Sequence, residues 1–271
     1  MIKKTILFGL IVLLAGCSSS SPHPSEQYLR FLPLQDGTLA VSGGDAVYLD
    51  EIVIPEKHDG KLVKKIDDYG FKDFASLKSI KIPDSIEMIG YGAFQGCYSL
   101  PEITLPFVGP TLDSESTFGY AFGDSSYSIT NDSIPVNLKK ITISNGMTTL
   151  SRNAFCMCRK VETIVLPTTL KNISFACFAE CRELKSFDVP FGVEKIEDLA
   201  FSFCYNLKEI TIPNTVKEIH LRFLHSCSSL EKITFNGTVN EWNSIEKIWK
   251  TDGTEGTTTV ICNDGTARLS S

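Results

Sequence analysis

The segment that decides the fold is residues 189–212, which read VPFGVEKIEDLAFSFCYNLKEITI. The segment before it, residues 166–189, reads LPTTLKNISFACFAECRELKSFDV and carries apolar residues at the same places. Aligned on their prolines, Pro167, Pro190 and Pro213 follow one another at steps of 23 residues. Self-similarity at a fixed period of this length is the signature of a solenoid, in which each repeat forms one coil.

The repeat unit contains two kinds of segment. It reads Ile-Pro-x-x-Val-x-x-Ile-x-x-x-Ala-Phe-x-x-Cys-x-x-Leu-x-x-Ile-x-Ile. Its end alternates with period two and predicts a short strand, which the proline then terminates. The Ala-Phe-x-x-Cys part has the spacing of one helical or 3₁₀ turn with an inward apolar face. We therefore expect stacked parallel strands about 4.8 Å apart, with short helical turns opposite them.

The repeat extends in both directions from this segment. An earlier copy follows Pro83, and the first coil starts at Pro55 with five extra residues. A longer coil of 38 residues runs from Pro106 to Ile143, and we expect its insertion, about residues 113–133, to loop off the body. The sequence thus predicts seven coils over 55–235, an N-terminal cap over 31–54 and a C-terminal cap over 236–271. In the C-terminal cap, Trp242, Ile245 and Trp249 share a helical face, and a strand follows over 257–262.

The N-terminus has the pattern of an export signal. Lys3 and Lys4 precede about ten mostly apolar residues, a run too short to cross a bilayer. Leu14-Ala15-Gly16-Cys17 then resembles a lipobox, which implies lipid attachment at Cys17 and cleavage before it. We predict a lipoprotein signal peptide over 1–17 and a flexible tether over 18–30; an ordinary secretory peptide is the alternative. Ser18 favours the outer membrane in a two-membrane cell; otherwise we expect the outer face of the cell membrane.

The repeat resembles the BspA-like type of leucine-rich repeat over roughly residues 50–262. The resemblance implies a cell-surface or secreted bacterial protein, with adhesion, host-matrix binding or coaggregation among the known roles, and no shared catalytic residues. The chain departs from the pattern at Phe74 in the Cys column, Cys177 in the Ala column and Phe223-Leu224 in place of Ala-Phe.

The cysteines and histidines do not form a recognisable reactive site. Five cysteines occupy the repeat column and predict buried, reduced thiols: Cys97, Cys158, Cys181, Cys204 and Cys227. A Cys156–Cys177 bridge between adjacent coils stays open, as does the redox state of Cys262. The four histidines, His23, His58, His220 and His225, stand at no metal-ligand spacing. We expect no metal, no cofactor and no enzyme, and the net charge of -6 argues against nucleic acid.

Two surfaces are candidates for binding a partner. The first is the outward strand positions: Ser79, Lys81, Glu102, Thr104, Lys140, Thr142, Thr163, Val165, Ser186, Asp188, Glu209, Thr211, Lys232 and Thr234. Their threonines also suit any exposed strand, so a purely structural role is the alternative. The second is the insertion, with Phe118, Tyr120, Phe122 and Tyr127 as exposed aromatics.

These surfaces lead to one main functional prediction and two alternatives. The main one is a lipid-anchored surface protein that binds a protein or extracellular-matrix ligand in adhesion or host interaction. The alternatives are an envelope scaffold for the cell's own surface proteins and, more remotely, an unrecognised hydrolase. The sequence leaves the oligomeric state open.

Overall fold

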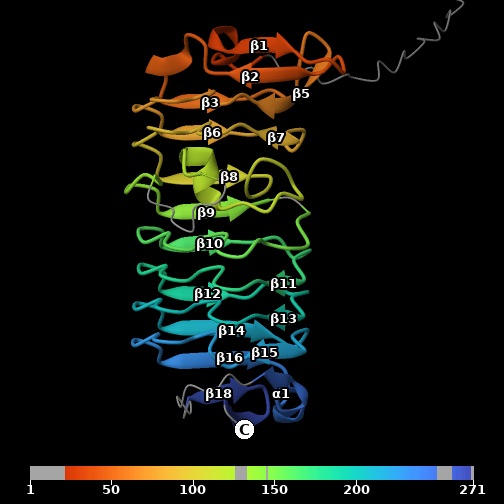
Figure 1. Cartoon of the computed structure of the whole chain (residues 1–271), viewed down its shortest axis with the longest axis vertical. Coiled ribbons are helices and arrows are strands. Elements are labelled where there is room, and N and C mark those ends of the chain that lie inside the picture. Colours follow the sequence, from red (N-terminus) through yellow and green to blue (C-terminus); the bar gives the residue numbers. More distant parts are fainter. Residues whose placement is uncertain (1–21, 126–132, 145, 249–257, 270–271) are drawn as a thin grey trace, which may run out of the picture.

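A computed structural model describes residues 22–125, 133–144, 146–248 and 258–269. The coils stack one on another into an upright column, with the N-terminal cap at one end and the C-terminal cap at the other (Figure 1). The predicted signal peptide with Cys17, as well as Tyr127 and Trp249, lies outside the described residues. Within the described residues, no helix has the length and apolarity needed to span a membrane.

The first column of strands comes from the Leu-x-x-Ile-x-Ile segments, as predicted. Parallel pairing joins β3 to β6, β8 to β9 and β10, and β12 to β14, β16 and β18, with repeat positions in register. For example, Ile210 lies opposite Phe187 on one side and Ile233 on the other. The bounds are β3 Glu51–Val53, β6 Ser79–Lys81, β8 Glu102–Leu105, β9 Lys140–Ile143, β10 Thr163–Val165, β12 Ser186–Asp188, β14 Glu209–Pro213, β16 Lys232–Asn236 and β18 Thr259–Cys262.

A second column of shorter strands follows the proline of each coil. It comprises β5 (Lys61–Ile66) and β7 (Met88–Ile89) near the N-terminus, then β11 (Asn172–Ile173), β13 (Lys195–Ile196), β15 (Glu218–His220) and β17 (Glu246–Ile248). These strands also pair in parallel. The buried residue of each of these strands is the isoleucine of the Val-x-x-Ile part of the repeat, for example Ile196 and Ile219.

The Ala-Phe-x-x-Cys segments form a third column, in which tight turns replace a continuous helical turn. Alternate backbone N–H groups bond within the turn and to the next coil: Cys177 N–H donates to Ser174 O at 3.2 Å, whereas Phe178 N–H donates to Ala200 O at 2.7 Å. Two residues per turn take left-handed backbone angles, such as Ala176 at φ 52° and Glu180 at φ 58°. This alternation satisfies the turn's polar groups through the neighbouring coil, so the turns also depend on stacking.

The three columns enclose one continuous core. The repeat phenylalanines stack along it, with Phe178 centred 5.4 Å from Phe155 and 4.9 Å from Phe201. These rings are fully buried, as is the repeat leucine Leu207. Each coil therefore buries its apolar face only against its neighbours, which explains why the sequence period predicted the fold.

The insertion differs from the prediction, because much of it is core. Residues Phe118–Phe122 form the 3₁₀ helix η3, and Phe118 and Phe122 are 1% and 0% exposed. Phe122 packs against Phe94 of one neighbouring coil and Phe118 against Phe155 of the other. The helix thus fills the turn column across a widened coil, so the expectation of exposed aromatics was wrong for these two residues. Leu112, aligned to a core position by the repeat, is 41% exposed, and Phe107 and Val108 are buried before it.

The N-terminal cap begins earlier than predicted. It contains η1 (Glu26–Tyr28), β1 (Arg30–Pro33), β2 (Leu39–Ser42), η2 (Ala46–Tyr48) and β4 (Lys57–His58). Strand β1 pairs antiparallel with β2, which pairs with β5. Ser25 is buried and accepts the Val53 N–H at 3.0 Å, and Leu29 is buried too. The expected tether over 18–30 is therefore wrong for Ser25 to Arg30, because these contacts fix that segment on the body.

The C-terminal cap closes the other end. Helix α1 (Val239–Ser244) starts with a capping box between Thr238 and Glu241 and buries Trp242 completely. Ile245 is buried just beyond the helix in extended backbone. Strand β18 turns through residues 263–264 into β19 (Gly265–Arg268), and Trp242 donates its indole N–H to Arg268 O at 2.9 Å. The Trp242 side chain and the β18–β19 hairpin thus cover the last coil.

Candidate functional site

The outward positions of the first strand column form a continuous surface, which we call the strand face. Each predicted residue on it is exposed or half-buried, whereas the residues between them, such as Ile103 and Ile210, are buried. Register aligns them in rows along the column, for example Asp188 beside Thr211 and Thr211 beside Thr234. A parallel sheet with uncovered polar side chains at fixed spacing can bind an extended partner over several coils.

Charges on the strand face pair mainly with one another. Lys140 lies 3.1 Å from Glu102, and Lys232 lies 4.0 Å from Glu209. The flanking position adds Lys139–Glu162 and Lys208–Glu231 pairs at 3.8 and 3.7 Å. Exposed pairs of this kind add little stability, and they leave a surface of mixed sign. Such a surface suits hydrogen bonding better than capture of a polyanion.

A shallow hollow of about 300 Å³ lies on the C-terminal half of the strand face. It is lined by six residues from three consecutive coils, Lys185, Ser186, Lys208, Glu209, Glu231 and Lys232. Val165, 43% exposed, is an apolar outward residue of the next coil toward the N-terminus. The arrangement offers ammonium groups and carboxylates around a small recess, which can hold a polar side chain or backbone segment of a partner.

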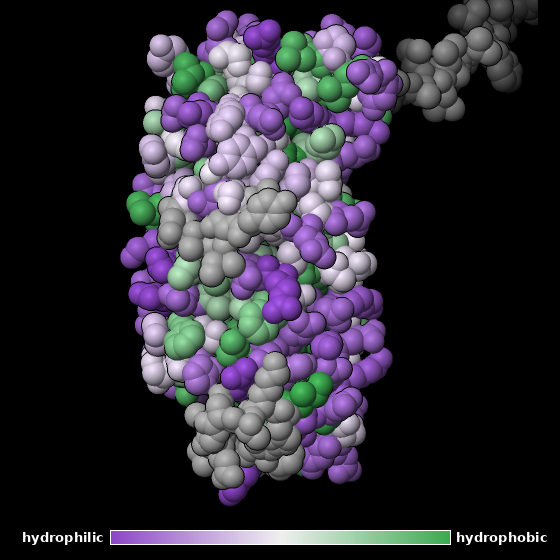
Figure 2. Space-filling view, viewed as in Figure 1, coloured by the Kyte–Doolittle hydropathy of each residue, from purple (hydrophilic) through white to green (hydrophobic). Residues whose placement is uncertain are grey.

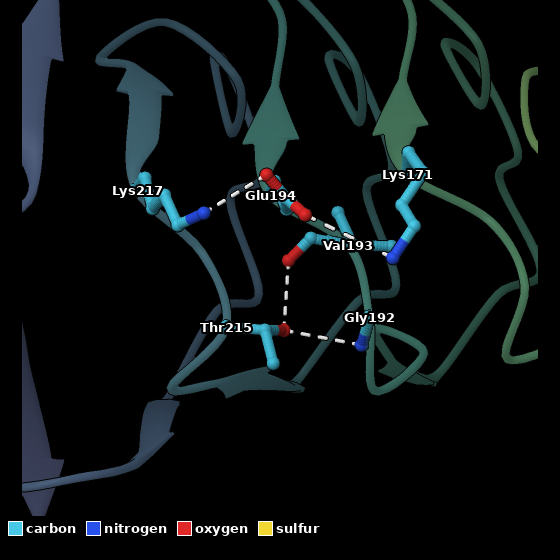
Figure 3. A network of polar contacts seen from close by, with 6 residues as sticks. All are labelled: Lys171, Gly192, Val193, Glu194, Thr215 and Lys217. Atoms are coloured by element: carbon cyan, nitrogen blue, oxygen red, sulfur yellow. Dashed lines mark hydrogen bonds and ion pairs between the residues drawn. The ribbon is translucent and has the colours of Figure 1, made fainter.

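The second strand column also presents charges, but its polar groups are bound into the structure (Figure 3). Glu194 lies between Lys171 at 3.8 Å and Lys217 at 3.0 Å. The Lys217 ammonium, which donates to Glu194, holds the pKa of that carboxyl below its usual value. Thr215 donates to Val193 O at 2.8 Å and accepts from Gly192 N–H at 3.1 Å. The side of the molecule that carries β11, β13 and β15 is accordingly hydrophilic in Figure 2.

The repeat cysteines are buried in the core, as a structural role requires. Cys97, Cys158, Cys181 and Cys204 are 0–1% exposed, Cys227 is partly exposed, and the described cysteines are free thiols. Burial raises the pKa of the Cys97 and Cys156 thiols to about 12. It also raises the pKa of Cys177, Cys181 and Cys204 well above the usual value. Protonated thiols of this kind are poor nucleophiles and poor metal ligands.

The histidines lie apart and contact different groups. His220 lies 3.2 Å from Glu218, whereas His225 packs edge-on against Phe203. His58 stacks on Phe31 with ring centroids 3.8 Å apart, and His23 is 2.9 Å from Ser25. Over the described ranges, no three His, Cys, Asp or Glu side chains gather as metal ligands would.

Sequence reasoning missed a second hollow, on the outer face of the N-terminal cap. Its volume is about 480 Å³, and its lining includes Arg30, Lys65, Asp67, Asp68 and Tyr69. These residues come from β1, from β5 and from the turn after β5, outside the regular repeat positions. The N-terminal cap lacks the 23-residue repeat. Only the pairing of β1, β2 and β5 in the structure shows that these lining residues lie close together.

Comparison with known proteins identifies the repeat. The family model described as the BspA type leucine rich repeat region matches residues 46–135 and 133–245, in six copies. No curated protein matches the chain. A leucine-rich cell surface protein of Faecalibacterium prausnitzii is 16% identical, with 86% of this chain and 100% of that one covered and a TM-score of 0.46.

Two further solved structures are similar at the level of the repeat. The leucine-rich repeat protein of T. pallidum is 22% identical over 79% of this chain and 86% of its own, with a TM-score of 0.39. The pneumococcal vaccine antigen PcpA is 16% identical over 82% and 90%, with a TM-score of 0.40. The family match itself spans well over half of the sequence. The chain therefore belongs to the BspA-type leucine-rich repeat family.

Proposed function

We propose that this protein is a lipid-anchored surface protein that binds a protein partner through the strand face, in adhesion or host interaction. The observation that carries the proposal is the outward side chains of successive coils, which lie in register on one uncovered sheet. They include neighbouring hydrogen-bond donors and acceptors, such as Thr211 and Thr234. An extended protein segment would contact several coils at once, so modest contacts at each coil would add up.

Surface exposure and anchoring rest on other observations. The match to the BspA-type repeat family supports a place outside the cell. The Leu14-Ala15-Gly16-Cys17 motif supports a lipid on the Cys17 sulfur. Two or three acyl chains would hold the protein firmly, since each buried methylene contributes about 0.8 kcal/mol.

A pull-down with photo-crosslinking tests the partner. The bait is residues 17–271 with Cys17→Ser, offered to host-matrix proteins, host cells and the producer's own envelope. The strand-face variant combines Lys81→Glu, Glu102→Lys, Thr142→Ala, Asp188→Lys and Glu209→Lys. The matched control reverses the Figure 3 pairs on the other column through Lys171→Glu, Glu194→Lys and Lys217→Glu.

Three outcomes separate the readings. Capture of a host protein by the parent bait and the control, lost in the strand-face variant, supports the proposal. Capture of only a producer envelope protein supports the envelope scaffold instead. Capture that the strand-face variant retains would refute the proposed face.

Anchoring is tested separately in producing cells. Labelled palmitate should enter the parent protein and be absent from Cys17→Ser, and protease added to intact cells should cleave the parent. Failure of labelling would remove the anchor from the proposal, and protection from protease would remove the outward location.

A further inference from the structure

The hollow on the N-terminal cap lies away from the strand face. Its floor is the outer face of three neighbouring strands, β1, β2 and β5, with Arg30 directly opposite Ser42. The other face of these strands points into the core through buried Val41 and Ile66. A neighbouring hollow of about 600 Å³ shares Arg30 and Gly44 and extends to the stacked rings of Phe31 and His58. Each of the two hollows has the volume of a small-molecule site.

The charges around the hollow balance. Arg30 and Lys65 face Asp67 and Asp68 in the lining. Lys65 lies 3.3 Å from Asp67, and Asp68 accepts the Tyr91 N–H at 3.0 Å. Arg30 has no ion pair or side-chain hydrogen bond to other described residues, so its guanidinium donors are available. A formally neutral set of donors and acceptors suits a neutral ligand with many hydroxyl groups better than an anion.

Tyr69 supplies the aromatic side chain of the lining, and the Lys72 ammonium lies over its ring, 5.2 Å from the centroid. Tyr69 is 45% exposed, and its ring packs edge-on against Tyr91, which in turn packs edge-on against Tyr120, each with centroids 5.5 Å apart. Its backbone is left-handed at φ 55°, and the equivalent residue of the next coil is Gly92, at φ 59°. A tyrosine at this angle costs about 1 kcal/mol or more relative to glycine. The corresponding residues Asn153, Ala176 and Leu199 are left-handed as well, so this angle belongs to the repeat turn, which also accommodates glycine.

We propose that this hollow binds a short neutral glycan. Tyr69 would pack against a C–H face of a sugar ring, because an aromatic ring combines an apolar body with a polar tip. Arg30 would donate to ring or hydroxyl oxygens, and Asp67 and Asp68 would accept from hydroxyl groups. A peptide added to the free edge of β1 is the rival ligand. The lining favours the glycan, since the hollow lies on the sheet's face and its one aliphatic lining side chain is Leu32.

The substitution that tests the aromatic side chain is Tyr69→Gly. It removes the ring and at the same time relieves the left-handed backbone, as Gly92 does in the next coil. Folding should therefore survive, which circular dichroism and the melting temperature can verify. Arg30→Gln is the second variant, at an exposed position where a folding defect is not expected. Tyr98→Ala is the control, because Tyr98 is 60% exposed and lines neither hollow.

The experiment begins with residues 17–271 carrying Cys17→Ser on an array of neutral, sialylated and sulfated oligosaccharides and, in parallel, on an array of short peptides. Titration calorimetry with the best neutral oligosaccharide then compares the variants. We expect Tyr69→Gly and Arg30→Gln each to weaken binding at least tenfold, and Tyr98→Ala and the strand-face variant to leave it unchanged. The strand-face variant is included so that failure of glycan binding at the hollow can be distinguished from failure of protein binding at the strand face. Absence of any neutral glycan, preference for charged ones, binding of peptides instead, or binding that both variants retain would overturn the proposal.

Discussion

The thiol of Cys97 donates a hydrogen bond to the carbonyl oxygen of Phe71, 26 residues earlier, over 3.2 Å. The same bond recurs from Cys181 to Phe155, from Cys204 to Phe178 and from Cys227 to Phe201, at 3.1–3.2 Å. The repeat cysteine thus reaches back to the turn of the preceding coil and satisfies a carbonyl there. A small apolar side chain with a weak donor fits both demands of this column.

The first prediction follows from the ionisation of Cys97. Its pKa is raised by burial to about 12, against 9.0 for an ordinary thiol. Between these values the unfolded chain releases the proton and the folded chain keeps it, so the stability from this thiol is complete below pH 9 and is lost as pH rises toward 12. The free energy of unfolding should fall by about 1.4 kcal/mol per pH unit in this window for each such thiol.

Denaturant titrations of the parent and Cys97→Ala at pH 8, 9, 10 and 11 measure this loss. The variant is less stable at pH 8, because a carbonyl loses its partner, but its decline above pH 9 should be shallower by about 1.4 kcal/mol per unit. Equal slopes in the two proteins would show that Cys97 ionises normally in the fold.

The second prediction concerns the ion pair between Asp198 and Arg222. Both Arg222 Nε and Nη2 donate to the Asp198 carboxylate, at 3.2 and 2.5 Å, and the Asp198 side chain is only 4% exposed. Asp198→Asn should cost about 2–4 kcal/mol of unfolding free energy, because it removes the buried carboxylate charge that pairs with the partly buried guanidinium. The exposed pair of Glu194 and Lys217 is the control, and Glu194→Gln should leave the melting temperature unchanged. If Asp198→Asn and Glu194→Gln changed the stability by similar amounts, burial would not be what makes the Asp198–Arg222 pair important.

The 23-residue repeat allowed the core residues and the outward strand residues to be predicted from the sequence. Leu207, Ile210 and Ile212 recur at fixed positions, so their alternation showed which residues enter the core, and all three are buried. The strand face followed from the same alternation, because the residues between the buried ones must point outward. Its exposure is confirmed, whereas its binding role stays a prediction.

Where the period fails, the sequence is ambiguous. Phe118 and Phe122 lie in a stretch rich in Ser, Gly and Asp, which reads as a loop, yet both rings fill the gap that the longer coil opens between Phe94 and Phe155. Likewise Arg30 and Tyr69 are brought to one hollow by the pairing of β1, β2 and β5. Such long-range packing has no local signal in a single sequence.

The third prediction tests the hydroxyl of Thr215, drawn in Figure 3. Thr215→Val keeps the shape of the side chain but leaves Val193 O and Gly192 N–H without this partner. We expect a loss of about 1–2 kcal/mol in unfolding free energy. Thr211→Val on the strand face is the comparison; valine suits a strand, so that variant should be as stable as the parent. If both valines were neutral, the Thr215 hydroxyl would contribute no net stability.

The fourth prediction uses the left-handed turn positions. Ser226 is exposed and has a left-handed backbone at φ 59°. The residue at the same position of the repeat turn in an earlier coil is Gly96, at φ 79°. Ser226→Gly should raise the free energy of unfolding by about 0.5–1 kcal/mol, because relief of strain exceeds the extra entropy of the unfolded glycine chain. Ser226→Val should lower it, since a β-branched residue is poorly tolerated at positive φ.

Ser228, exposed two residues later, lacks a positive φ, so Ser228→Gly should destabilise the protein through unfolded-state entropy alone. Opposite signs for the two glycine substitutions in chemical denaturation would establish the left-handed turn as the cause, whereas equal destabilisation would mean that Ser226 carries no strain.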